Sequence, residues 1–165
     1  MSPLLIRPAH SADLKRLVEL TLHVELFRNY GMTESSALSL FETALSDPES
    51  DVAVVAFAAK EADSGIPGKV LGFAWFLRKG AFGRSAYLRL IAVDPAARGT
   101  GAGRKLLEHF EGKYLAPHGI FLLVTHTNDS AQGFYERSGY SRVGEIPDFI
   151  QKGMNERIYF KPAAD

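Results

Sequence analysis

RGTGAG, residues 98–103, is the stretch of this 165-residue sequence that decides the fold. It consists of Arg98-Gly99-Thr100-Gly101-Ala102-Gly103 and lies between a predicted strand and a predicted helix. Glycines in alternate positions permit a tight turn whose backbone amides are not obstructed by Cβ atoms. The following helix adds free N–H groups and the positive end of its dipole. The turn is therefore predicted to bind an anion, above all a phosphate group; the alternative is a turn that only packs a helix onto a sheet.

Two nucleotide-binding patterns do not fit this turn. The dinucleotide pattern G-x-G-x-x-G fails because, counted from Gly99, its last position is Arg104. The P-loop pattern fails because no Gly-Lys-Ser/Thr follows the turn. The turn also comes late in the chain, after a series of strands, and not in an opening βαβ unit. A nucleotide-binding domain of either kind is therefore not expected.

Strands and helices are expected to alternate around the turn. Ser11 is predicted to cap a first helix that ends or is interrupted at Gly31, and a second helix starts at Thr33. Short connections predict an antiparallel meander in the first half, and a βαβ crossover follows. Residues 61–69 are interpreted as a loop between strands. The predicted fold is α/β with a mixed sheet, whose strands are residues 4–7, 52–59, 70–77, 85–93, 120–125, 140–144 and 157–160, and whose later helices are 101–115 and 128–138.

Composition and charge limit the class of protein. The length fits one domain spanning residues 1–165. Lysine plus arginine and aspartate plus glutamate both number 19, so the net charge is zero and a general nucleic-acid binder is not expected. The longest apolar run, residues 52–59, is too short for a membrane span. No signal peptide is recognised at the N-terminus. A cytoplasmic protein without a membrane partner is therefore predicted. The sequence has no cysteine, which excludes disulfides, and its histidines lack metal-ligand spacing, so no metal is expected.

A second motif strengthens the functional interpretation of the turn. Asn128-x-x-Ala131-x-x-Phe134-Tyr135-Glu136-x-x-Gly139-Tyr140 follows Val93-Asp94-Pro95-x-x-Arg98-Gly99-x-Gly101-x-Gly103, and the chain closes with Glu156-Arg157-Ile158-Tyr159-Phe160-Lys161. In these motifs, in their order and spacing, the sequence closely resembles the GCN5-related N-acetyltransferase superfamily over nearly the whole chain. The resemblance implies a single-domain fold whose mixed central sheet splays open between strands 85–93 and 119–125 around the arm of acetyl-CoA.

The resemblance also implies the residues that bind acetyl-CoA. The strand before the turn would pair through its backbone with the pantetheine arm, and the amides of the turn would hold the pyrophosphate. Asn128 would hydrogen-bond the cofactor arm, although from the residues alone it is equally a helix N-cap. The implied cofactor-binding residues are Ile91, Ala92, Val93, Arg98, Gly99, Thr100, Gly101, Ala102, Gly103, Asn128 and Phe134.

Tyr135 is the catalytic residue that the resemblance implies. In the family, the tyrosine at this position protonates the departing coenzyme A thiolate, and a phenol is protonated at neutral pH. From the residues alone, Tyr135 is interpreted as a core aromatic side chain. The base stays open, because Arg89 occupies the position at which many relatives carry a glutamate. The candidates are Glu25, Glu145, Asp148, His23 or a water molecule.

Direct attack of a primary amine in a ternary complex is favoured, since the chain has neither a cysteine nor a G-x-S-x-G elbow for a covalent intermediate. The acceptor is predicted to be a small molecule. The alternatives are a peptide N-terminus, or a non-catalytic module that senses acyl-CoA. A homodimer is expected, since relatives are often dimers. The acceptor pocket is predicted between the first two helices and the last loop, with Glu25, Phe27 and Tyr30 on one side and Asp148, Phe149 and Met154 on the other.

Overall fold

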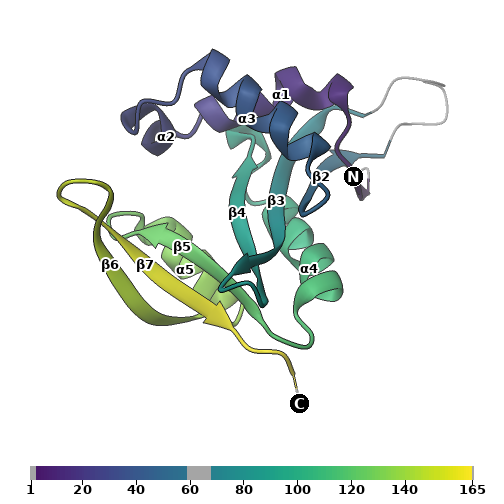
Figure 1. The fold of residues 1–165 in the computed structure, drawn as a ribbon. Coiled ribbons are helices and arrows are strands. Elements are labelled where there is room, and N and C mark those ends of the chain that lie inside the picture. The colour runs from purple at the N-terminus through teal and green to yellow at the C-terminus, as the bar shows by residue number, and fades with distance from the viewer. Residues whose placement is uncertain (1–2, 59–67, 165) are drawn as a thin grey trace. The chain divides into compact units, whose positions relative to one another are not determined.

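The structure is a computed structural model that describes residues 3–58 and 68–164. Figure 1 shows the order of its elements along the chain. They are β1 (Leu4–Pro8), a 3-10 turn (Ser11–Asp13), α1 (Leu14–Leu22), α2 (Glu25–Asn29), α3 (Glu34–Ser46), β2 (Ser50–Phe57), β3 (Val70–Ala81), β4 (Ser85–Val93), a second 3-10 turn (Pro95–Ala97), α4 (Ala102–Tyr114), β5 (Ile120–Thr125), α5 (Asp129–Arg137), β6 (Ser141–Gln151) and β7 (Met154–Lys161).

The strands form a mixed sheet. Within the described residues its seven strands have the order β1-β2-β3-β4-β5-β7-β6. β1 and β2 are antiparallel, whereas β4 and β5 are parallel and are joined by α4, which is the predicted βαβ crossover. β7 is antiparallel to both of its neighbours, β5 and β6. The predicted α/β class with a mixed sheet is confirmed.

The chain packs as two compact units. The first comprises Met1–Trp75 and Leu90–His109, and the second comprises Phe76–Arg89 and Phe110–Asp165. β3, β4 and α4 each contribute residues to both units. A single domain over residues 1–165 therefore stays a prediction.

The core of the first unit lies between its helices and β2 and β3. α1 and α3 pack side by side (Figure 1) and bury Leu17 and Phe41 completely. The ring of Phe41 meets that of Phe73 edge to face at 5.2 Å between centroids. Trp75 Nε1 donates a hydrogen bond to Ser50 Oγ at 3.0 Å, which satisfies the indole in the core.

The start of the first helix differs from the prediction. α1 begins at Leu14, and Ser11 lies in the preceding 3-10 turn instead of capping the helix. Asp13 organises this turn, because its carboxylate accepts the His10 N–H at 2.8 Å and both Nη atoms of Arg7 at 2.7 and 2.8 Å. The prediction also missed α2, which begins after Val24 because that residue is in an extended conformation and interrupts the helical run.

The core of the second unit is built around β5. Ile120 and Leu122 are completely or almost completely buried beneath α5. Arg157 Nη1 and Tyr159 Oη of β7 hydrogen-bond to Gln132 and Glu136 of α5, the latter at 2.9 Å. β5 pairs with β7 along Ile120–Thr125, whereas its register with β4 covers Ile120–Leu122. The opening of the sheet between β4 and β5 beyond Leu122 stays a prediction, because the part of β4 after Arg89 belongs to the first unit and β5 belongs to the second.

The last two strands are longer than predicted. β6 runs over Ser141–Gln151 instead of residues 140–144, and β7 over Met154–Lys161 instead of 157–160. Pro147 breaks the sequence pattern, but β6 is the last strand of the sheet, where proline is tolerated because one side needs no donor. Asp148 and Phe149 therefore lie in β6 and Met154 in β7, not in a last loop.

Two smaller differences concern β2 and β3. β3 extends to Ala81 instead of residue 77. Residue 59 of the predicted strand 52–59, and residues 61–67 of the predicted loop, lie outside the described residues.

No helix in the described parts of the chain is long and apolar enough to cross a membrane.

Candidate active site

The glycine turn of the first unit has the backbone conformation that an anion site requires. Gly99 and Gly101 have φ values of +77° and +85°, in the left-handed region that favours glycine. A Cβ built on either would meet no described atom within 4 Å beyond the adjacent residues. Arg98 and both glycines are exposed. The N–H groups of Arg98 and Thr100 donate at 3.3 Å to the carbonyl oxygens of Pro95 and Ala97, within the turn. The amides that an anion could use are therefore those of the two glycines and of the first turn of α4, which begins at Ala102.

Asp94 anchors the beginning of this turn. Its Oδ1 accepts the Ala96 N–H at 2.9 Å, and its own N–H donates to the Leu71 carbonyl oxygen at 2.7 Å. Arg16 of α1 donates from Nη2 to Asp94 Oδ2 at 2.5 Å and from Nε to the Val70 carbonyl oxygen at 3.0 Å. The Ala96 amide and then Arg16 lower the pKa of Asp94 below its usual value. The sequence analysis missed both residues: Asp-Pro before the turn is a capping pattern that could have pointed to Asp94, but no local signal pointed to Arg16.

The strand that leads into the turn is closely packed on one side. Ala92 is buried, and Ile91 and Val93 are half-buried at the end of β4. A Cβ on Gly72 of β3 would lie 2.8 Å from the Ala92 carbonyl oxygen, so only glycine permits this approach of the two backbones. The three predicted pantetheine-binding residues thus lie on a rigid part of the first unit.

The second motif forms the beginning and middle of α5 in the second unit. Asn128 is confirmed as the N-cap of this helix, because its Oδ1 accepts the Ala131 N–H at 3.1 Å. The ring of Phe134 meets that of Tyr135 edge to face at 5.2 Å. The structure thus places Asn128, Phe134 and Tyr135 on one short helix, whereas the turn residues belong to the other unit.

Tyr135 is buried, with 6% of its surface exposed. Burial raises the pKa of its phenol far above the usual value, and the nearby Tyr87 raises this pKa further. The hydroxyl is therefore protonated at neutral pH, as an ordinary phenol is, and the raised pKa makes it a weaker acid than an exposed tyrosine. No hydrogen bond to this hydroxyl is found within the described residues, so its proton is not committed to a neighbouring group there.

A buried carboxylate, Glu156, lies on the sheet face that α5 does not cover. Tyr87 pairs with Phe121, and Thr125 pairs with Glu156, so alternate side chains of β4, β5 and β7 share this face. Glu156 is 3% exposed, and Thr125 Oγ1 donates a hydrogen bond to its Oε1 at 2.8 Å. The sequence analysis did not select Glu156; its only signal was an acidic residue at a buried position of the closing strand.

Tyr87 connects the electrostatics of this face with those of Tyr135. Burial raises the pKa of Tyr87, Arg89 lowers it and Glu156 raises it, so both charges act on this phenol. Tyr87 in turn raises the pKa of Tyr135. Arg89 is exposed on β4, at the position where the resemblance leads one to expect a glutamate.

The profile of the acetyltransferase (GNAT) family matches residues 19–140. The chain belongs to the GNAT family. It is 28% identical over 159 residues to glucosamine 6-phosphate N-acetyltransferase 1 of rice (Oryza sativa subsp. japonica), covering 94% of this chain and 86% of the relative. Two solved structures with the same fold are the ribosomal-protein-S18-alanine N-acetyltransferase from Escherichia coli and the spermidine N-acetyltransferase from Vibrio cholerae. The first has a TM-score of 0.73 at 19% identity over 99% of this chain and 96% of that chain. The second has a TM-score of 0.73 at 20% identity, and the match covers 97% of this chain and 95% of that chain.

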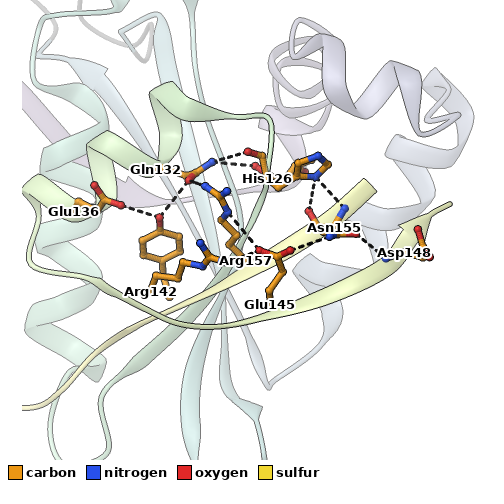
Figure 2. Close-up of polar contacts among 10 residues, drawn as sticks. His126, Gln132, Glu136, Arg142, Glu145, Asp148, Asn155 and Arg157 are labelled. Carbon is orange, nitrogen blue, oxygen red and sulfur yellow. Dashed lines mark hydrogen bonds and ion pairs between the residues drawn. The ribbon is translucent and has the colours of Figure 1, made fainter. Parts of the chain in front are cut away.

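A polar network holds the β6–β7 hairpin of this GNAT chain to the end of β5 (Figure 2). The Asn155 N–H donates to His126 Nδ1 at 3.0 Å, and Asn155 Nδ2 donates to Glu145 Oε1 at 2.8 Å. Asn155 Oδ1 accepts the Asp148 N–H at 3.2 Å, and Asp148 Oδ1 accepts the Gly153 N–H at 2.5 Å. Two of the predicted candidate bases, Glu145 and Asp148, are therefore members of a hydrogen-bonded framework.

Glu145 has properties that oppose a role as base. Besides Asn155, it is paired with Arg142 at 2.5 Å and with Arg157 at 3.6 Å. The hydrogen bond from Asn155, followed by the charges of these arginines, lowers the pKa of Glu145. A carboxylate held in its charged form by several donors accepts a proton poorly.

The residues predicted to line the acceptor pocket fall on both units. Glu25, Phe27 and Tyr30 lie on or next to α2 in the first unit, whereas Asp148, Phe149 and Met154 lie on β6 and β7 in the second. A pocket lined by all six stays a prediction. His23 and Glu25 are exposed at the end of α1 and the start of α2. Across residues 3–58 and 68–164, no group of three or more His, Asp or Glu side chains is placed to hold a metal ion.

Proposed function

We propose that this GNAT protein transfers the acetyl group of acetyl-CoA to a primary amine of a small molecule. The observation that carries the proposal is the exposed glycine turn, in which Gly99 and Gly101 adopt left-handed conformations beside open space. Tyr135, which stands at the position of the family's proton donor and is buried on α5, supports a transferase as opposed to a module that only binds acyl-CoA.

The amides of Gly99, Gly101, Ala102 and Gly103 and the charge of Arg98 would bind the pyrophosphate of acetyl-CoA, whereas the amides of Arg98 and Thr100 donate to Pro95 and Ala97. The backbone of Ile91, Ala92 and Val93 would pair with the pantetheine arm. Asn128 caps α5 with its Oδ1, which leaves its Nδ2 as a donor for the same arm. Phe134 would add an apolar contact to this arm. No metal is required for this chemistry.

The acceptor nitrogen would attack the thioester carbonyl carbon directly. A C–N bond forms, the C–S bond breaks, and the thiolate leaves with the electron pair of that bond. Tyr135 would donate its proton to the thiolate sulfur, and the acceptor amine would lose one proton. Alignment of the two substrates supplies much of the rate.

The relatives support a small amine as acceptor without specifying it. The rice relative is named for glucosamine 6-phosphate, and one similar structure is named for spermidine. Another is named for the alanine of a ribosomal protein, so a peptide N-terminus remains the alternative acceptor. A panel of spermidine, glucosamine 6-phosphate and short peptides, with thiol release as the readout, separates these classes.

The cofactor assignment is tested by the melting temperature with and without acetyl-CoA. A ligand that binds only the folded state raises this temperature by mass action. Gly101→Glu should abolish the rise, because it puts bulk and negative charge into the turn. The matched control is Gly83→Glu, since Gly83 has a φ of +64° and equally open surroundings but lies in the β3–β4 turn. An equal rise in both folded variants would refute the site.

A homodimer in the cytoplasm is a further part of the proposal, and light scattering that reports a monomer would refute the dimer.

A further inference from the structure

Glu156 is a buried carboxylate of β7, with 3% of its surface exposed. Burial of a charged side chain costs free energy unless partners stabilise it. Thr125 fixes one oxygen of this carboxylate through a hydrogen bond of 2.8 Å. Both residues lie at the ends of their strands, Thr125 as the last residue of β5 and Glu156 near the start of β7.

Glu156 and the proposed acid lie on different sides of the sheet. Glu156 lies on the face of β4, β5 and β7 that also carries Tyr87, whereas Tyr135 belongs to α5, which covers the other face. The charge of Glu156 raises the pKa of Tyr87, which shares its face of the sheet. All three side chains belong to the second unit.

This arrangement matches what acetyl transfer needs. The attacking amine and the departing thiolate occupy different positions around the thioester carbon, so the proton acceptor and the proton donor must also lie apart. A donor on the α5 side and an acceptor on the opposite face satisfy this condition where the sheet opens, as the resemblance implies, beyond the paired residues Leu88 and Leu122. Arg89 cannot act as the acceptor, because a guanidinium stays protonated in proteins.

We infer that Glu156 is the base of the proposed reaction: its carboxylate takes one proton from the acceptor ammonium, and the neutral amine then attacks the thioester carbon. The nitrogen loses its second proton to solvent as the C–S bond breaks, and Tyr135 gives one proton to the thiolate sulfur. Tyr135 then regains a proton from solvent and Glu156 releases its own, so each turnover releases one proton in total. The groups that face Glu156 include Tyr87 of β4, whose pKa both Glu156 and Arg89 shift, and Thr125 of β5, which donates a hydrogen bond to it. The inference rests on the proposed function.

The test is Glu156→Gln, which retains the shape of the side chain and an oxygen that can accept from Thr125. The matched control is Glu145→Gln, which removes a carboxylate of β6 that the hairpin network already holds. The rate of thiol release is measured at saturating acetyl-CoA with the amine that wild type turns over fastest among spermidine, glucosamine 6-phosphate and short peptides. Each variant is measured from about pH 7 to about pH 10.

At neutral pH, kcat/KM for the amine should fall by roughly 10²–10⁴ in Glu156→Gln, the usual scale for loss of a general base, and much less in Glu145→Gln. The deficit should shrink as the pH approaches the pKa of the amine, because a neutral amine no longer needs the base. A purely structural defect would not depend on pH in this way.

Two results would overturn the inference while the proposed function stands. One is wild-type turnover by Glu156→Gln while Tyr135→Phe is slow. The other is a deficit in Glu156→Gln that is the same at every pH. If wild type binds acetyl-CoA but turns over no amine of the panel, the proposed function itself fails, and the role of Glu156 fails with it.

Discussion

The guanidinium of Arg16 in α1 holds the carboxylate of Asp94, the residue before the glycine turn, at 2.5 Å. The two side chains are 19% and 13% exposed, so the ion pair is largely withdrawn from water. Asp94 also caps the 3-10 turn that leads to Arg98. The conformation of the glycine turn, the proposed anion site, therefore depends on a residue that is distant from it in the sequence.

Arg16→Met should weaken acetyl-CoA binding, because Asp94 loses the charge that fixes it and the turn becomes less ordered. Titration calorimetry should show a dissociation constant raised by about fivefold to fiftyfold, equivalent to roughly 1–2 kcal/mol. Arg7→Met is the matched control, since Arg7 forms a similar ion pair with Asp13 in the same unit but away from the turn. Equal affinities in the two variants would contradict the role of Arg16.

The Arg7–Asp13 pair should make stability depend on acid pH. The hydrogen bond from Arg7 lowers the pKa of Asp13 in the folded protein, so the carboxylate stabilises the fold above its unfolded pKa of about 3.9. This contribution is lost as the pH falls through the lower, folded pKa. Urea unfolding of wild type and Asp13→Asn should differ in free energy at pH 6 and converge toward pH 3. A difference that does not shrink on acidification would contradict this origin.

Gly119→Ala should destabilise the second unit strongly. Gly119 has a φ of +74°, and an added Cβ would lie 2.5 Å from Phe160 Cε2 and 2.6 Å from the Lys161 carbonyl oxygen. Gly153→Ala is the matched control, since its φ is +83° but its surroundings are open. Strain alone should cost about 1–2 kcal/mol in Gly153→Ala, and overpacking should add about 1–3 kcal/mol in Gly119→Ala. Thermal unfolding with equal losses in both variants would refute the predicted clash.

Local patterns in the sequence predicted the parts of the site that depend on local structure. The glycine turn and the Asn128 cap arise from residues within one turn of each other, so their chemistry can be inferred from spacing. Glu156 and Arg16 could not be predicted in this way. Glu156 is brought beside Thr125 only by the register of β5 and β7, and Arg16 reaches Asp94 only when α1 packs beside the end of β4. The length of β6 was missed because the effect of Pro147 depends on whether its strand is at the edge.

Turnover by Tyr135→Phe tests the proposed acetyl transfer most directly. The change removes one oxygen and little packing, so the free energy of unfolding should change by no more than about 1 kcal/mol, and the affinity for acetyl-CoA should stay nearly constant. With the best amine of the panel, kcat should fall by roughly 10²–10⁴, because the thiolate loses its proton donor. A Tyr135→Phe variant that is folded, binds acetyl-CoA and releases thiol at the wild-type rate would contradict the account.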